Sequence, residues 1–351
     1  MSKNICGIQQ IGIGIPDLKV AWEWYRKHFG MDIPIFQESA EAALMTKYTG
    51  KKVHSRNAVL AINLQGGAGM ELWQFTSRNT EASKFDIQLG DYGIFCTKIK
   101  CHNVKKTYEH YKKQGLDILG KINHDPTGNE HFFIRDPYGM IYQIMKGNDW
   151  FGKGKHLTGG ISGCTIGVSD IDKSLKLYRD VLDFDEIVYD KKGVFNDFEA
   201  LPSGTGETRR VLLKRSKKAT GSFSELLGAN YIELVQALNR EPKKIFENRF
   251  WGDQGFIHLC FDVQNMNSLR DECKANDFPF TVDSANSFDM GEASGHFSYI
   301  EDPDGTLIEF VETTKIPIIK KIGWYLDVKK RDRQKALPKW MLNMLSLSRI
   351  K

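Results

Sequence analysis

A short segment near the C-terminal end of the chain, Glu301–Phe310 (EDPDGTLIEF), occurs a second time in altered form. The other copy is Asp136–Gln143 (DPYGMIYQ), with Gln143 at the position of Glu309. In both, an Asp-Pro-x-Gly turn leads into a strand-like run, because proline fixes φ and glycine accepts the positive φ that a tight turn often needs. An internal repeat of this kind restricts the fold more than an isolated motif does.

The repeat extends over most of the chain as four similar units. Each unit begins with a short alternating strand and continues through a polar residue suited to cap a helix into an amphipathic helix. The strands are Gln9–Ile15, Ile94–Cys101, Ile161–Val168 and Phe256–Val263, and the caps are Asp17, Asn103, Asp170 and Asn265. The last strands of the units are Gly69–Phe75, Gly139–Met145, Asn230–Gln236 and Thr306–Val311. This pattern predicts an α+β fold built from four βαβββ units.

Units one and three are most alike, as are units two and four, so the chain has the form of a duplicated pair. We predict one domain over residues 1–150, a second over residues 151–315 and a basic amphipathic tail over residues 316–351. Five apolar residues of the tail recur at helical spacing: Trp340, Met341, Met344, Leu345 and Leu347. We expect this stripe to pack on its own domain or on a partner subunit. The alternatives are a lid over the mouth of the fold and a helix lying on a membrane.

Charge is distributed unevenly along the chain. Residues 320–351 hold ten Lys and Arg against two Asp, a local charge of +8, so the rest of the chain carries −3 within the net charge of +5. No basic face with interleaved aromatic residues occurs in that rest, which argues against nucleic acid as a partner. Its one basic strand, Arg209–Arg215, is predicted to be a solvated sheet edge, since Lys and Arg protect edges from pairing.

The cysteines and the lengths of the apolar segments bear on the cellular compartment of the protein. Six cysteines are scattered without a CxxC pair, as is typical of reduced thiols in the cytoplasm. The N-terminus lacks an apolar run of the length of a signal peptide, and no segment is long enough to span a membrane. We therefore expect a cytoplasmic protein without integral membrane association, and the sequence leaves a homodimer open.

The four units, the Asp- or Asn-capped helices and the DPxG hairpins together resemble the vicinal oxygen chelate superfamily. That superfamily contains glyoxalase I, methylmalonyl-CoA epimerase, the fosfomycin and bleomycin resistance proteins and the extradiol ring-cleaving dioxygenases. The resemblance covers roughly Ile5–Glu312. It implies two half-open mixed-sheet barrels, each made of two units around one divalent metal ion, with ligands from the first and last strand of each unit.

The resemblance also assigns ligand positions. The first-strand position holds Gln10, Cys96, Gly163 and His258 in units one to four, and the last-strand position holds Glu71, Gln143, Glu233 and Glu309. Strand parity agrees with the assignment, because the apolar residues next to Gln10 and His258 point to the opposite face.

Two pairings of the units give two different metal sites. If units one and four combine, the ligands are Gln10, Glu71, His258 and Glu309. If each half forms its own barrel, the ligands are Glu233, His258 and Glu309. We favour the exchanged pairing, because it leaves one full ligand set and one degenerate set. Two carboxylates, an imidazole and an amide suit Zn²⁺, Ni²⁺, Co²⁺, Mn²⁺ or Fe²⁺.

The resemblance implies an enzyme, a metal-dependent lyase or isomerase of the glyoxalase type. Its partner would be a small molecule with vicinal oxygens that reacts through a metal-stabilised enediolate. By the same resemblance Glu309 is the general base and Glu71 its counterpart. Gly14 stands where glutathione-using glyoxalases often carry an arginine, which argues against glutathione.

Two other functions fit the same sequence. The segment Tyr299–Gly305 resembles a dioxygenase signature, so an Fe(II)-dependent ring-cleaving or 2-oxo-acid dioxygenase is an alternative, although Gly163 replaces the second histidine of that group. The other alternative is a metal-free binding or resistance protein that holds its ligand between aromatic side chains such as Trp73, Phe75 and Trp251.

Overall fold

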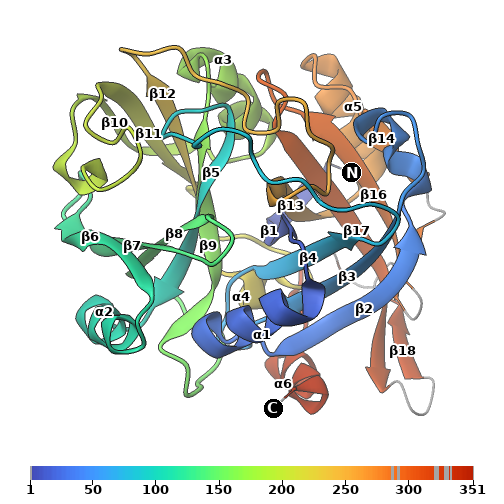
Figure 1. Cartoon of the computed structure of the whole chain (residues 1–351). Helices are drawn as coiled ribbons and strands as arrows, with labels where there is room; N and C mark the ends of the chain where they lie inside the picture. Colours follow the sequence, from blue (N-terminus) through green and yellow to red (C-terminus); the bar gives the residue numbers. More distant parts are fainter. Residues whose placement is uncertain are drawn as a thin grey trace.

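The computed structural model describes residues 2–285, 288–290, 293–319, 324–327, 332 and 334–350. It contains the four predicted units in order (Figure 1). Unit one comprises β1 (Asn4–Gly14), α1 (Leu18–Phe29), β2 (Ile33–Glu41), the 3₁₀ helix η1 (Ala43–Tyr48), β3 (Ser55–Ile62) and β4 (Gly69–Phe75). Unit two comprises β5 (Gly93–Cys101), α2 (Val104–Lys113), β6 (Asp117–His124), β7 (Glu130–Arg135) and β8 (Ile141–Lys146).

Units three and four repeat this order with additions. Unit three comprises β9 (Thr158–Gly167), α3 (Ile171–Leu175) with its π-helical continuation η2 (Lys176–Val181), β10 (Glu186–Gly193), η3 (Asn196–Phe198), β11 (Thr208–Lys214), α4 (Ser224–Leu227) and β12 (Tyr231–Ala237). Unit four comprises β13 (Gly255–Gln264), α5 (Met266–Ala275), β14 (Val282–Asp283), β15 (Phe288–Met290), β16 (Ala293–Glu301) and β17 (Leu307–Ile319). The tail adds β18 (Trp324–Asp327), α6 (Lys339–Asn343) and η5 (Met344–Ser348).

The strands form two mixed sheets, as the fold class predicted. The first sheet has the order β14-β16-β17-β13-β1-β4-β3-β2, with β15 beside β16 and β18 beside β17. The second has the order β10-β11-β12-β9-β5-β8-β7-β6. Within each unit the first and last strands are parallel neighbours, as in β1 with β4 and β13 with β17.

Each sheet joins units from different halves of the chain. In the first sheet β1 pairs antiparallel with β13, which combines units one and four. In the second sheet β5 pairs antiparallel with β9, which combines units two and three. Figure 1 shows the result in colour, since the blue strands of unit one continue into the orange strands of unit four. The structure therefore has the exchanged pairing of units, one with four and two with three, which the sequence analysis favoured from the types of ligand residue.

Three of the four predicted helix caps have the predicted contact. The side chains of Asp17, Asn103 and Asp170 each accept a hydrogen bond from a backbone N–H of the first turn. The fourth helix, α5, begins differently. Asn265 adopts a φ of 66°, and the carboxylate of Glu312 accepts the backbone N–H groups of Asn265 and Met266. A residue of the last strand thus caps that helix, which the local sequence pattern could not indicate.

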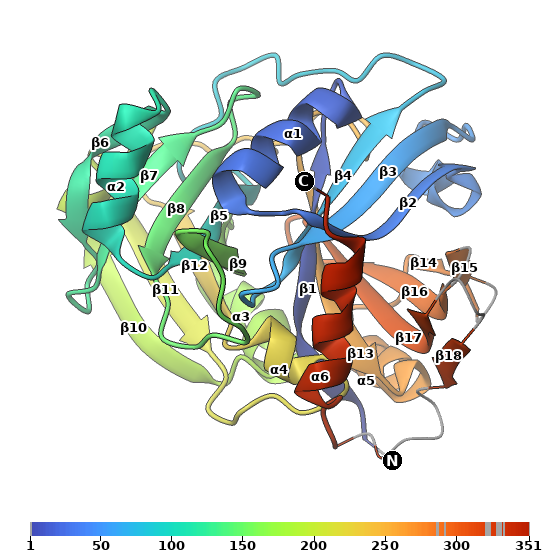
Figure 2. The ribbon, with the colours of Figure 1, turned by 90° about the horizontal axis from the view of Figure 1, so that it is seen from below.

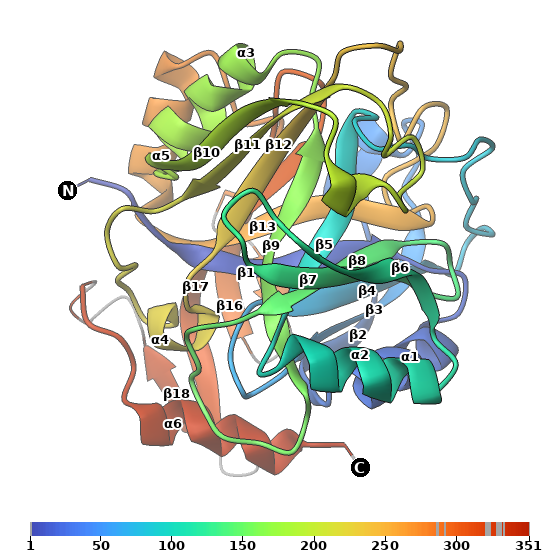
Figure 3. The ribbon, with the colours of Figure 1, turned by 90° about the vertical axis from the view of Figure 1, so that its left-hand side faces the viewer.

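The two DPxG turns join the units within each half. Asp136 accepts two backbone N–H groups of its own turn and the hydroxyl of Tyr25 from α1, at 2.6 Å. Asp302 does the same in unit four, with the hydroxyl of Tyr178 at 2.9 Å. Helices α1 and α2 lie side by side, and the hydroxyl of Tyr111 donates to the carbonyl of His28 (Figure 3). The halves thus keep contacts of their own although their strands pair across.

The C-terminal tail packs on the chain itself, one of the arrangements expected for it. Leu337 and Leu342 are buried in a cluster with Phe151 and Leu226, and α6 lies beside α4 (Figure 2). Trp340 and Leu347 of the predicted stripe are 56% and 78% exposed. The prediction of the stripe was therefore only partly right, since Met341 and Leu345 pack against this cluster and Trp340 and Leu347 face outward. The chain also leaves the α-helical period after Asn343 and continues as a 3₁₀ helix. No helix among the described residues is long and apolar enough to cross a membrane.

Candidate metal centre

Four side chains from four strands meet on one face of the first sheet. They are Gln10 on β1, Glu71 on β4, His258 on β13 and Glu309 on β17. His258 Nε2 lies 3.2 Å from Glu71 Oε2 and 3.1 Å from Glu309 Oε2. Gln10 Nε2 donates to Glu71 Oε2 at 2.9 Å and to Glu309 Oε2 at 3.5 Å. The structure thus brings together all four residues of the exchanged set, while Glu233 lies in the other sheet.

Backbone register explains how the four side chains meet. In the parallel pair β1–β4, Gly12 lies opposite Glu71, and in the antiparallel pair β1–β13, Gly12 lies opposite His258. A Cβ atom at Gly12 would stand 2.2 Å from His258 Cε1. Only glycine leaves room here for the imidazole between the two units. The sequence shows Gly12 only as one small residue in an alternating strand, so its role was missed.

The donor set fits a divalent cation. The four residues are 4%, 8%, 0% and 7% exposed in the order given above, so water cannot screen the two carboxylates well. One oxygen or nitrogen atom from each of Glu71, His258 and Glu309 lies within 4.8 Å of the others. Among the described residues, Gln10 Oε1 has no hydrogen-bond partner. A buried acceptor without a partner, beside an imidazole and two converging carboxylates, is what a cation would satisfy.

The pKa of His258 reflects the two carboxylates. Burial alone would lower that pKa, but Glu309 and Glu71 outweigh burial and raise it to about 9. At neutral pH and without a metal the imidazole therefore carries a proton. That proton supplies the positive charge that keeps the carboxylates together.

Metal binding at this centre is expected to depend on pH. Since a metal ligand must be the neutral imidazole, one proton leaves His258 for each ion bound below pH 9. The affinity for Zn²⁺ should therefore rise about tenfold per pH unit from pH 7 to 9 and then level off. Calorimetric titrations in buffers of different ionisation enthalpy would count the released proton. An affinity that stays flat over this range would contradict the prediction.

Aromatic side chains enclose the centre on one side. Trp251 stacks on His258 with ring centroids 6.2 Å apart at 16°, and Trp73 meets Trp251 at 4.2 Å. The hydroxyl of Tyr299 lies 3.5 Å from His258 Nδ1 and so fixes the orientation of the ring. Two of the three aromatic residues expected to hold a ligand, Trp73 and Trp251, therefore lie beside the candidate metal centre.

Sequence and structure comparisons give the family. The profile of the Glyoxalase/Bleomycin resistance protein/Dioxygenase superfamily matches the chain twice, over residues 7–144 and 160–310. The chain belongs to this superfamily. Glyoxalase I from Zea mays is similar in fold, with 14% identity and a TM-score of 0.53, and the match covers 89% of this chain and 92% of that one. A putative dioxygenase from Bacillus subtilis gives 11% identity and a TM-score of 0.57, with 100% and 98% covered. No curated protein is similar enough in sequence to match.

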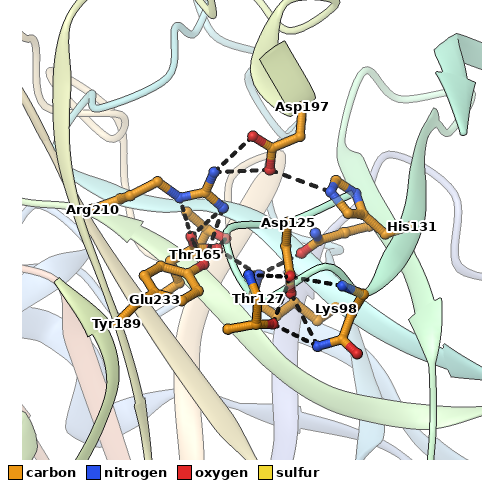
Figure 4. Close-up of polar contacts among 11 residues, drawn as sticks. Lys98, Asp125, Thr127, His131, Thr165, Tyr189, Asp197, Arg210 and Glu233 are labelled. Carbon is orange, nitrogen blue, oxygen red and sulfur yellow. Dashed lines mark hydrogen bonds and ion pairs between the residues drawn. The ribbon is translucent and has the colours of Figure 1, made fainter. Parts of the chain in front are cut away.

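The second sheet of this superfamily member holds a different centre (Figure 4). The resemblance placed Cys96, Gln143, Gly163 and Glu233 here, a poor ligand set. In the structure Lys98 Nζ donates to the amide oxygen of Gln143 and, at 2.7 Å, to Glu233 Oε2. Lys98 lies opposite Gln143 in β5–β8, as Gly12 lies opposite Glu71 in β1–β4. An ammonium group of the chain itself therefore stands between the side chains where the first sheet gathers its ligands.

A second buried cation completes this network. Arg210 is fully buried and donates to Asp197 at 2.8 and 2.9 Å and to Glu233 at 2.7 Å. Burial alone would raise the pKa of Glu233, but Arg210 and Lys98 outweigh it and hold that pKa well below its usual range. The hydroxyl of Tyr189 also donates to Glu233, at 2.6 Å.

The prediction of a solvated edge for Arg209–Arg215 was wrong. The edge strand is β10, and β11 pairs with β10 on one side and β12 on the other. Because side chains alternate along a strand, Arg209 points to the surface and pairs with Asp172 and Asp190, while Arg210 points into the core. Two adjacent arginines at the start of the strand, one on each face, hid this alternation.

Proposed function

We propose that the chain is a metal-dependent lyase or isomerase of the glyoxalase type that acts on a small molecule with vicinal oxygens. The observation that supports this most is the convergence of Gln10, Glu71, His258 and Glu309 from two units on one buried point. We propose these four residues as ligands of one Zn²⁺, Ni²⁺, Co²⁺, Mn²⁺ or Fe²⁺ ion per chain. When bound, the metal acts as a Lewis acid that favours negative charge on a substrate oxygen next to the carbon that loses a proton.

The residues of the chain perform the proton transfer. Glu309 carries a carboxylate at the centre, 3.1 Å from His258 Nε2, and accepts a long hydrogen bond of 3.5 Å from Gln10 Nε2. It is free to accept the proton from the carbon and to return it to the neighbouring carbon. Glu71, from the other unit, lies 3.2 Å from the same nitrogen of His258. It can therefore accept or donate a proton on the opposite face of the substrate. Trp73 and Trp251 exclude water from the reacting atoms.

Proton exchange in D₂O tests this function directly. The chain, loaded with one of the five metals, is incubated with dihydroxyacetone, and loss of the C–H signal is followed by proton NMR. We expect metal-dependent exchange, lowered about 10²–10⁴-fold in Glu309→Gln because the base is lost. Gln143→Ala, at the corresponding position of unit two, should exchange like the wild type.

The same experiment separates the alternative functions. Oxygen uptake with catechols or 2-oxo acids, without proton exchange, would indicate a dioxygenase in place of a lyase or isomerase. A centre with one imidazole and two carboxylates differs from the two-histidine set typical of such iron enzymes. Absence of metal after reconstitution with all five ions would leave a metal-free binding protein and overturn the proposal.

A further inference from the structure

An arginine with unused hydrogen-bond donors lies near the candidate metal centre. Arg56 on β3 is opposite Phe75 on β4, and Ala58 is opposite Trp73, so Arg56 shares the sheet face that carries Glu71. It is 8% exposed. Its Nη2 group donates to Glu38 Oε1, while Nε and Nη1 have no hydrogen-bond partner among the described residues.

A continuous row of rings connects Arg56 with the metal centre. The guanidinium carbon stands 4.7 Å from the centroid of Trp73, Trp73 meets Trp251 at 4.2 Å, and Trp251 stacks on His258 at 6.2 Å. Arg56 therefore leans along the strands toward the centre, although its α-carbon is about 13 Å along the strand from the level of Glu71 by the usual rise per residue. The two indole rings thus link the guanidinium group to the candidate metal centre.

The row also contains further donors without acceptors. The indole N–H groups of Trp73 and Trp251 are buried and lack partners among the described residues. A buried donor without a partner is unfavourable, and a charged one is more so. Four such nitrogen atoms in one row, all of them donors, indicate a missing acceptor with negative charge. Glu38 does not fill this role, because it engages only Nη2 and its side chain is 22% exposed.

We propose that Arg56 binds the carboxylate of the substrate, so that the proposed enzyme acts on an organic acid whose planar body lies along Trp73 and Trp251. The vicinal oxygens of that acid would face Glu71, His258 and Glu309. This inference rests on the proposed function and names its substrate class. The guanidinium is suited to the role, since it is planar, permanently charged and stacked on an aromatic face.

Calorimetry with matched ligand pairs tests the proposal in two states of the full chain. In metal-free protein, benzoate is compared with benzamide, which has the same shape and no charge. In metal-loaded protein, 3,4-dihydroxybenzoate is compared with its methyl ester, since both carry vicinal oxygens. We expect each acid to bind at least about tenfold more tightly than its neutral partner, as is typical of a hydrogen bond to a charged group.

Three variants assign the preference to a residue. Arg56→Met should abolish the preference for the acids and leave the affinity for the neutral ligands and the metal content unchanged. Glu38→Gln should strengthen acid binding, because it removes the carboxylate that competes for Arg56. Arg209→Met, an arginine of the second sheet with its own acidic partners, should behave like the wild type.

The possible outcomes distinguish failure of the carboxylate site at Arg56 from failure of the proposed metal-dependent enzyme. Equal affinity for acid and neutral ligands in the wild type, or a preference that survives Arg56→Met, would overturn the inference while metal binding and proton exchange still stand. Conversely, a benzoate preference that depends on Arg56 in a chain that binds no metal would refute the enzyme and keep the acid-binding site.

Discussion

Replacement of His258 by alanine is expected to reduce the bound metal from one ion per chain to less than about a tenth of an ion. The change removes the only nitrogen ligand of the candidate centre and leaves Gln10, Glu71 and Glu309 as oxygen donors. An oxygen-only set of three residues no longer suits the borderline ions that prefer imidazole. The measurement is elemental analysis of purified protein after reconstitution and dialysis.

A matched control exists in the second sheet. His131 is also a buried histidine beside a carboxylate, with Nε2 3.3 Å from Asp197 Oδ2. We expect His131→Ala to keep one ion per chain, because the cations Lys98 and Arg210 already occupy that network. Loss of metal in His131→Ala with retention in His258→Ala would place the ion in the second sheet and contradict the assignment.

Replacement of Arg210 by alanine is expected to destabilise the chain by about 3–5 kcal/mol. Removal of one partner from a buried ion pair leaves an uncompensated charge in the core, and this costs more than the pair itself contributes. Here two carboxylates would lose the guanidinium that bridges them. Among the described residues, Asp197 would keep His131, and Glu233 would keep Lys98 and the hydroxyl groups of Tyr189 and Thr165. Urea unfolding followed by tryptophan fluorescence measures the change in the free energy of unfolding.

The neighbouring arginine provides the reference for this change. Arg209→Ala removes a guanidinium from the same strand, but its partners Asp172 and Asp190 are 73% and 40% exposed. Exposed pairs contribute about 0–1 kcal/mol, so we expect a loss within that range. Similar losses for both variants would show that burial of the Arg210 network has little effect on stability.

Much of the fold followed from the sequence, because its signals are local and repeated. The alternation around Gln10 and His258 fixed the inner face of each strand, and the turns at Asp136 and Asp302 fixed where the last strands begin. The exchanged pairing of the units followed from chemistry, since only that pairing gathers a full ligand set. The comparison of four aligned positions therefore carried information about contacts between distant segments.

The residues that sequence reasoning missed are charged side chains in buried positions. Lys98 follows the aligned position Cys96 by two residues and so points to the same face, yet a lysine is ordinarily assumed to lie at the surface. Arg56 and Arg210 were missed for the same reason. The available signal was position: Lys98 lies in a strand whose nine residues are all buried, and a charge there requires a partner. Which partner it finds depends on tertiary contacts with β12 that no local pattern specifies.

The pairing of β1 with β13 and of β5 with β9 has a consequence for the symmetry of the molecule. Two identical chains of two units each could form the same pair of sheets, but every substitution would then appear in both. In a single chain the two sheets carry independent sequences, so one can hold a lysine where the other holds a glycine. The junctions are also intramolecular, and their formation does not depend on protein concentration. Tandem linkage has thus separated the roles of the two sheets, one suited to an ion and the other closed by the side chains of the protein.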